Sequence, residues 1–156
     1  MQMKISIVTG PIRSGKTTYL QKLIKEKKDL AGILSPVMND IRFFQNIVNG
    51  EMKSMETTSE DSSALQIGRF HFSQIAFDWA SEVIENACSN QTDVVIVDEI
   101  GPLELQDKGF AKLLKSILMK DNFSGELILV IREKMLDEIL LFFNIKKENT
   151  NIINWK

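Results

Sequence analysis

Eight residues near the start of the chain have the types and spacing of a loop that binds phosphate. Residues 10–17 read G-P-I-R-S-G-K-T, which fits the pattern G-x-x-x-x-G-K-[ST] at every fixed position. Gly10 and Gly15 permit backbone angles and a close approach that a Cβ atom would block, so the backbone N–H groups can all point toward one anion. We therefore expect this loop to bind the phosphates of a nucleotide. The residues expected to contact them are Gly10, Pro11, Ile12, Arg13, Ser14, Gly15, Lys16, Thr17 and Thr18.

Two side chains of this loop suit a polyphosphate and its metal ion. Lys16 is expected to reach the β- and γ-phosphates and to assist catalysis there, and the Thr17 hydroxyl is expected to ligate Mg²⁺. The loop also opens a helix, whose unpaired N–H groups and positive dipole end favour an anion. Thr18 either helps that helix to start or reaches the α-phosphate. Mg²⁺ is thus the expected cofactor.

Two adjacent acids further along the chain form the second half of the expected site. Val94–Val97 is an apolar run followed directly by Asp98 and Glu99. A buried strand that ends in a carboxylate presents it at the sheet edge where open α/β sheets bind ligands. We expect Asp98 to hold Mg²⁺ through a water molecule, and Glu99 to orient and polarise the attacking water. Two acids can also merely mark the end of a strand, but the Mg²⁺ of a phosphate loop needs such an acid.

Three arginines are candidates for meeting the negative charge that develops in the transition state. Arg13 lies inside the loop, Arg69 lies further along the chain, and Arg132 follows an apolar run at 126–131. Exposed arginines are common, so each also has an ordinary structural interpretation. Arg132 is the preferred catalytic candidate, because its strand is expected to end on the same edge as Asp98.

The elements that would position these residues alternate between strands and helices. Apolar or β-branched runs predict strands at 4–9, 30–35, 93–100, 126–131 and 151–155. Helical spacing of apolar residues predicts helices at 17–28, 74–89, 107–120 and 133–143. This alternation predicts an α/β fold with a mainly parallel sheet covered by helices on both faces, the three-layer α/β/α arrangement of a P-loop NTPase domain.

Residues 36–73 interrupt the alternation and are predicted to form an insert that could cover the nucleotide. Arg42–Val48 and Glu51–Thr57 flank Asn49-Gly50, a dipeptide typical of a two-residue hairpin turn. The polar stretch 58–63 is predicted to be a loop, and the alternating stretch 69–73 a short strand. The base pocket is not identified: Phe77, Trp79 and Trp155 could stack on a base, but such aromatic residues usually belong to the core.

Length and composition exclude several other classes of protein. A chain of 156 residues predicts one domain, spanning 1–156, and its net charge of −2 offers no positive field for nucleic acid. The single cysteine, Cys88, cannot form an intrachain disulfide and is expected in the core. The apolar runs are too short to cross a bilayer, and the first residues already form a strand, which leaves no room for a signal peptide. We therefore expect a cytoplasmic protein with no membrane partner, and the sequence identifies no protein partner.

Several stretches resemble one family. The acidic motif D-E-I-G-P-L-E-L at 98–105 is similar to the extended motif of the small P-loop nucleoside-triphosphatases, phosphohydrolases that act on several nucleoside triphosphates. The resemblance includes G-P-I-R-S-G-K-T-T, then A-G-I-L-S-P at 31–36 with the following Arg42, Phe43 and Phe44, and I-G-R-F at 67–70. It implies that Lys16, Thr17, Asp98 and Glu99 carry the hydrolysis. Glu104 also matches an acid of the motif.

Together these features predict a Mg²⁺-dependent enzyme that hydrolyses the γ-phosphate of ATP- or GTP-type nucleotides. One alternative is a small kinase with the same loop, which would need a pocket for a second substrate, for which the space under the insert is a candidate. Another is a nucleotide-controlled switch, in which hydrolysis is slow and the insert docks a partner. Release of phosphate from ATP with no acceptor added would separate the hydrolase from the kinase.

Overall fold

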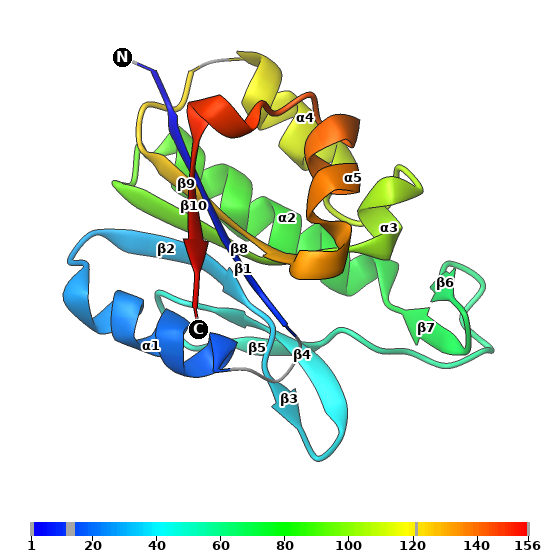
Figure 1. The fold of residues 1–156 in the computed structure, drawn as a ribbon. Helices are drawn as coiled ribbons and strands as arrows, with labels where there is room; N and C mark the ends of the chain where they lie inside the picture. The colour runs from blue at the N-terminus through cyan, green and yellow to red at the C-terminus, as the bar shows by residue number, and fades with distance from the viewer. Residues whose placement is uncertain (1, 12–14, 121, 156) are drawn as a thin grey trace.

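A mostly parallel sheet forms the centre of the protein (Figure 1). The computed structural model describes residues 2–11, 15–120 and 122–155, and within these the eight-stranded sheet has the order β10-β1-β9-β8-β2-β4-β3, with β5 paired to β4. Its parallel strands are β1 (Lys4–Gly10), β2 (Leu30–Leu34), β8 (Val94–Ile100), β9 (Glu126–Arg132) and β10 (Thr150–Asn154). The run Val94–Val97 is buried, as expected for a strand with both faces covered.

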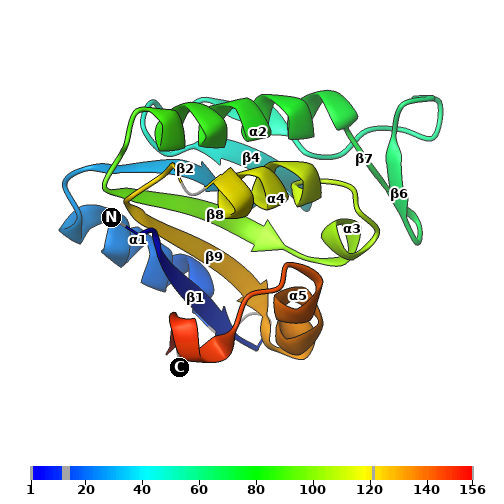
Figure 2. The same ribbon diagram turned by 90° about the horizontal axis from the view of Figure 1, so that it is seen from above.

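Helices cover both faces of this sheet, as Figures 1 and 2 show. On one face α1 (Lys16–Glu26) packs Leu20 against Val8 and Ile96. The larger core lies on the other face, and its helices are α2 (Gln74–Ser89), α4 (Ala111–Lys120) and α5 (Leu136–Phe142). The short helices are α3 (Pro102–Leu105), η1 (Glu133–Met135) and η2 (Lys147–Asn149). The predicted α/β class with helices on both faces of a mainly parallel sheet is confirmed.

The helix predicted from Asp107 was wrong in its first turn, because α4 begins at Ala111. Asp107 and Gly109 adopt positive φ angles of 61° and 60°, which an α-helix does not contain. The Glu104 carboxylate accepts hydrogen bonds from the backbone N–H groups of Gly101 and Phe110. Residues 101–110 are therefore folded around this buried carboxylate instead of continuing the helix.

The insert is only partly separate from the sheet. It contains β3 (Val37–Met38), β4 (Ile41–Asn46) and β5 (Met52–Ser54), and β4 pairs antiparallel with both β2 and β5. The predicted hairpin is thus confirmed, but its two-residue turn was wrong. Residues 47–50 form the connection, since Asn46 N–H donates to the Glu51 carbonyl and the Asn46 and Asn49 side chains accept from nearby backbone N–H groups.

A second hairpin of the insert projects from the body of the protein (Figure 1). It pairs β6 (Leu65–Ile67) with β7 (Phe70–Phe72) through a turn at Gly68 and Arg69. The predicted strand at 69–73 is therefore present, whereas its partner β6 was not predicted. Cys88 is buried, as expected. Among the described residues no helix combines the length and the apolar character that a bilayer crossing requires.

Candidate active site

Four parallel strands end at one edge of the sheet, and each delivers part of the site. β1 leads into the phosphate loop, β2 is followed by Ser35, and β8 ends beyond the adjacent acids Asp98 and Glu99. β9 ends at Arg132. The carboxyl edge of a parallel sheet is the usual place for ligands in such folds. Residues distant in the sequence thus come together because their strands share a direction.

The end of the phosphate loop is shaped by Gly15, the N-cap residue of α1. Its φ of 98° lies in the left-handed region, which glycine adopts without the strain that a side chain would bring. Lys16 is consequently the first residue of the helix, and the helix N-terminus faces the edge that carries the acids. The expected phosphate contacts of Ile12, Arg13 and Ser14, and the expected role of the Thr17 side chain, lie outside the described residues. Thr18 is exposed on the first turn.

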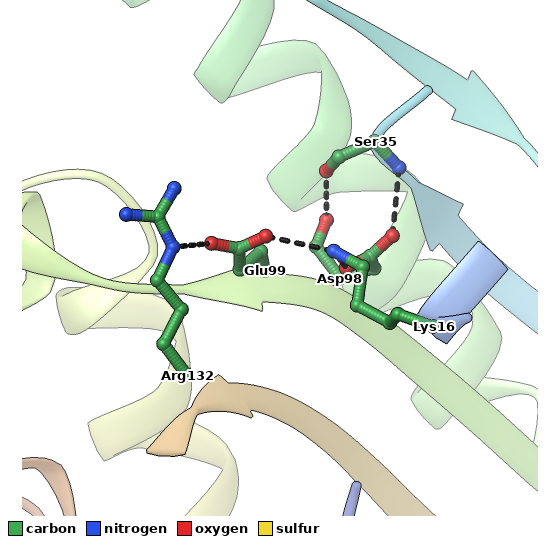
Figure 3. Close-up of polar contacts among 5 residues, drawn as sticks. All are labelled: Lys16, Ser35, Asp98, Glu99 and Arg132. Carbon is green, nitrogen blue, oxygen red and sulfur yellow. Dashed lines mark hydrogen bonds and ion pairs between the residues drawn. The ribbon is translucent and has the colours of Figure 1, made fainter. Parts of the chain in front are cut away.

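The Lys16 ammonium links the loop to both acids (Figure 3). Its Nζ lies 3.0 Å from Asp98 Oδ1 and 2.7 Å from Glu99 Oε2. The other oxygen of Glu99, Oε1, accepts a hydrogen bond of 2.6 Å from Arg132 Nε. The structure thus brings together the four residues predicted from separate stretches, with Glu99 between two cations. Their catalytic roles stay predictions.

An irregularity in β8 allows two consecutive acids to reach the same lysine. Successive side chains of a regular strand point to opposite faces. Here Asp98 is in register with Val130 and Ile100 with Ile131, so Glu99 has no partner in β9. A bulge of this kind turns a side chain away from its regular direction. Both carboxylates can therefore contact the end of α1.

Asp98 is the most buried member of the cluster, with 3 % of its surface exposed. Ser35, which sequence reasoning missed, donates from its backbone N–H to Asp98 Oδ2 at 3.0 Å and from its hydroxyl to the Asp98 carbonyl. Its place at the end of β2, on the edge that carries Asp98, was the available signal. Burial raises the pKa of Asp98 despite the neighbouring Lys16 ammonium. Ser35 and Lys16 hold this carboxylate in place.

Glu99 and Lys16 favour their charged forms. Burial alone would raise the pKa of Glu99, but Lys16 and Arg132 outweigh it and lower that pKa below its ordinary value. Burial alone would lower the pKa of Lys16, but Asp98 and Glu99 outweigh it and raise that pKa. An opposite charge within a few ångströms has this effect on both partners. Lys16 therefore remains a cation, able to meet phosphate.

A cleft of about 830 Å³ lies over this cluster and includes Gly10, Pro11, Gly15, Lys16, Glu99 and Arg132 in its lining. The insert contributes Arg42, Arg69 and Phe70 to the same lining. Among the described residues neither Arg42 nor Arg69 forms an ion pair with a carboxylate. The volume is within the range of small-molecule sites. The cleft therefore combines the loop, Glu99 and three arginines, of which Arg42 was not a candidate from the sequence.

Trp155 covers the first glycine of the loop. A Cβ atom added at Gly10 would lie 2.4 Å from Trp155 Cε2, far inside contact distance. The backbone N–H of Trp155 donates to the Thr9 carbonyl at 3.3 Å, and Trp155 also lines the cleft. A side chain at position 10 would therefore have to displace this ring, a constraint that the loop pattern does not contain.

The oxygen donors present fit a Mg²⁺ ion that enters with a nucleotide. Among the described residues no three His, Cys, Asp or Glu side chains are grouped so that they could hold a metal by themselves. Asp98 and Glu99 offer hard carboxylate oxygens beside the phosphate loop. Mg²⁺ commonly takes one or two carboxylates and completes its shell with substrate phosphates and water. The donor set therefore suits Mg²⁺ bound together with its substrate.

Comparison with known proteins identifies the family. A family model described as NTPase matches residues 5–155. The chain belongs to the NTPase family. Curated relatives include the nucleoside-triphosphatase THEP1 of Archaeoglobus fulgidus, 23 % identical over 149 residues that cover 92 % of this chain and 87 % of the relative. The THEP1 of Methanopyrus kandleri is 26 % identical over 159 residues, covering 96 % and 84 %.

Two solved structures have the same fold. The crystal structure of THEP1 from Aquifex aeolicus superposes with a TM-score of 0.70 at 21 % identity, covering 96 % of this chain and 88 % of that one. The solution structure of a human cancer-related nucleoside triphosphatase gives 0.69 at 18 % identity, covering 98 % and 89 %. The predicted family, fold and enzyme class, a nucleoside-triphosphatase, are confirmed.

Proposed function

We propose that this protein is a Mg²⁺-dependent enzyme that hydrolyses the γ-phosphate of ATP- or GTP-type nucleotides by attack of water. The observation that supports it most is the Lys16 ammonium, held by Asp98 and Glu99 at the N-terminus of α1. The cluster lies at a cleft large enough for a nucleotide. A cation, a helix N-terminus and two carboxylates at one point are the groups that phosphoryl transfer to water requires.

Lys16 exchanges partners when a nucleoside triphosphate binds. The ammonium leaves the two carboxylates for the β- and γ-phosphate oxygens, whose combined charge exceeds that of the two acids. The ammonium, which lies 2.7 Å from Glu99 and 3.0 Å from Asp98, is carried by the first residue of α1, next to the phosphate loop, which supports this exchange. The exchange frees the two acids at the moment when the reacting phosphate arrives.

Asp98 and the Thr17 hydroxyl are the groups that would hold Mg²⁺, which supplies charge neutralisation of the phosphates when bound. Asp98 suits this part because the Ser35 backbone N–H holds its Oδ2 and stays there when Lys16 leaves Oδ1. A ligand held in this way loses little freedom when the metal binds. Asp98 is therefore assigned as a metal ligand and not as the general base that activates water.

Glu99 orients the attacking water and takes its proton. Once Lys16 moves to the phosphates, one of the two cations that depress the pKa of Glu99 is lost, so the carboxylate becomes a better base. Arg132 keeps its Nε on Glu99 Oε1 and fixes the direction of the carboxylate. The remaining N–H groups of the guanidinium are available for the γ-phosphate, whose charge grows in the transition state.

Phosphate release from ATP, GTP, CTP and UTP, with and without Mg²⁺, tests this proposal. Glu99→Gln is expected to lower turnover by about 10²–10⁴-fold, the usual contribution of general-base help, while nucleotide binding is retained. Glu82→Gln, an exposed glutamate on α2, is the matched control and should leave turnover unchanged. Undiminished turnover in Glu99→Gln would remove Glu99 from this role. Absence of Mg²⁺-dependent phosphate release from all four nucleotides would overturn the proposal.

A further inference from the structure

A second cavity adjoins the nucleotide cleft at Glu99. Its volume is about 170 Å³, and we call it the side chamber. Its apolar wall includes Phe44, Met55, Phe70, Phe72, Phe77 and Leu103. Five residues line both the chamber and the cleft, namely Ser35, Arg42, Phe70, Glu99 and Arg132. The chamber is therefore continuous with the site where the reaction is proposed to occur.

The aromatic side of the side chamber offers no strong polar partner to water. Phe44 and Phe77 meet edge to face with centroids 4.9 Å apart, and Phe70 and Phe72 stack at 6.0 Å. An ordered water needs two to four polar partners and occupies only about 30 Å³. An apolar cavity of about 150 Å³ can hold a benzene ring. The chamber thus has the size and the lining for a single-ring organic molecule.

The polar groups of the side chamber gather where it meets the cleft. Glu99 offers acceptor oxygens there, and Arg42 and Arg132 offer donors. A neutral hydroxyl group suits both, since it donates to the carboxylate and accepts from a guanidinium, whereas a second carboxylate would be repelled by Glu99. Glu104 is not offered to a ligand, because its two oxygens accept from Gly101 and Phe110. The chamber therefore fits a molecule with an apolar body and one hydroxyl group.

We propose that the side chamber binds a small apolar alcohol, and that this alcohol competes with water for the γ-phosphoryl group. The inference rests on the proposed function, which places the γ-phosphate between Lys16 and Glu99. The alcohol oxygen forms a bond to the γ-phosphorus, and its proton passes to Glu99. The bond from the γ-phosphorus to the bridging oxygen breaks, and its electron pair leaves with the nucleoside diphosphate. The products are a phosphate monoester, the diphosphate and one proton, so no further reactant is needed.

The nucleotide base does not compete for this space. With the γ-phosphate at Glu99, the base lies at the opposite end of the triphosphate. The insert supplies most of the aromatic rings of the chamber, since Phe44, Phe70 and Phe72 belong to residues 36–73. A kinase with this loop was expected to need a pocket in this region. The insert therefore supplies an acceptor site beside a hydrolytic centre.

Gly101 offers a way to fill the chamber. It is buried and lines the cavity, yet a Cβ atom added there would meet nothing within 4 Å. A buried position with open space around it must face a cavity, so Gly101→Leu places a side chain inside the chamber. Ser89→Leu, at the exposed far end of α2, adds the same side chain elsewhere and controls for effects on folding.

The experiment measures phosphate esters formed from ATP and Mg²⁺ with benzyl alcohol, cyclohexanol or ethanol as acceptor. At equal concentrations, benzyl alcohol and cyclohexanol are expected to give at least about tenfold more ester per phosphate released than ethanol, which fills too little of the apolar chamber to gain from burial. Gly101→Leu should lower this ratio at least tenfold, and Ser89→Leu should not. Toluene, which has no hydroxyl group, should bind the chamber without nucleotide, give saturation-transfer NMR signals, and suppress ester formation.

Two results would overturn the inference and leave the proposed function standing. One is phosphate release with no more ester from the ring alcohols than from ethanol. The other is an ester ratio that Gly101→Leu does not change. Absence of both phosphate and ester would instead overturn the proposed function and with it the transfer step, and the toluene signals would show whether the chamber itself takes an apolar ring.

Discussion

The parallel strands and the insert contribute to one cleft in different ways. The strands and α1 supply Lys16, Asp98, Glu99 and Arg132, which are paired with one another at 2.6 to 3.0 Å. The insert supplies Arg42 and Arg69, which form no ion pair with any described carboxylate. The paired groups are held in position by one another, whereas no described carboxylate holds the arginines of the insert. We infer that the sheet edge performs the chemistry and that the insert selects what approaches it.

Removal of the Lys16 charge is expected to have the largest effect. Lys16→Met leaves Asp98 and Glu99 facing each other without their shared cation, and it removes the donor expected at the β- and γ-phosphates. Turnover should fall by about 10³-fold, at the upper end for loss of one transition-state donor, and nucleotide affinity should fall with it. Steady-state phosphate release and nucleotide titration measure the two effects. Lys22→Met, exposed on the same helix, is the control; a loss below tenfold in Lys16→Met would contradict the account.

Substitution of one arginine at the sheet edge and one in the insert compares the two regions directly. Arg132→Gln removes the hydrogen bond that orients Glu99 and should lower kcat by about 10²-fold. Arg69 stacks on Phe70, with its guanidinium carbon 5.3 Å from the ring centroid, at the border of the cleft. Arg69→Gln removes a charge in contact with solvent, worth up to about 1 kcal/mol, so its effect should stay near fivefold and fall mainly on KM. If Arg69→Gln lowered kcat more than Arg132→Gln, the insert would carry chemistry and the comparison would be reversed.

Substitution of Glu104 is expected to have the smallest effect on turnover and a clear effect on the free energy of unfolding. Burial raises the pKa of Glu104 to about 7, above the ordinary value of 4.5. Between pH 4.5 and pH 7 the folded protein therefore binds more protons than the unfolded chain. Glu104 then contributes to the free energy of unfolding below pH 4.5, and this contribution is lost as the pH rises toward 7. The loss is about 3 kcal/mol in all. Urea unfolding at several pH values measures this loss.

Glu104→Gln should lack that pH dependence. It should also unfold more easily, by about 1–3 kcal/mol at pH 5, because Gly101 and Phe110 donate to different oxygens of Glu104 and the amide replaces one of these oxygens with an NH2 group, which cannot accept. Parallel stability curves for the two proteins between pH 4.5 and 7 would show that Glu104 does not titrate in this range.

The alternating strands and helices could be predicted from the sequence, whereas the insert could be predicted only in part. The apolar run before Asp98 predicts both a strand and the edge where its acid lies, because strand direction in a parallel sheet is shared. By contrast, the pairing of β4 with β2 and the partner of β7 depend on contacts that no local pattern contains. Ser35 as a partner of Asp98, and the packing of Trp155 on Gly10, were missed for the same reason, since each contact joins residues far apart in the sequence.

The exchange of partners by Lys16 is the central claim, and a crystal structure with Mg²⁺ and a non-hydrolysable ATP analogue tests it most directly. The measurement is the distance from Lys16 Nζ to Glu99 Oε2, which is 2.7 Å in the structure described above. We predict that Nζ moves to about 3 Å from β- and γ-phosphate oxygens and beyond about 4 Å from Glu99, outside ion-pair distance. Lys16 still paired with both acids while the phosphates lie elsewhere would contradict the account.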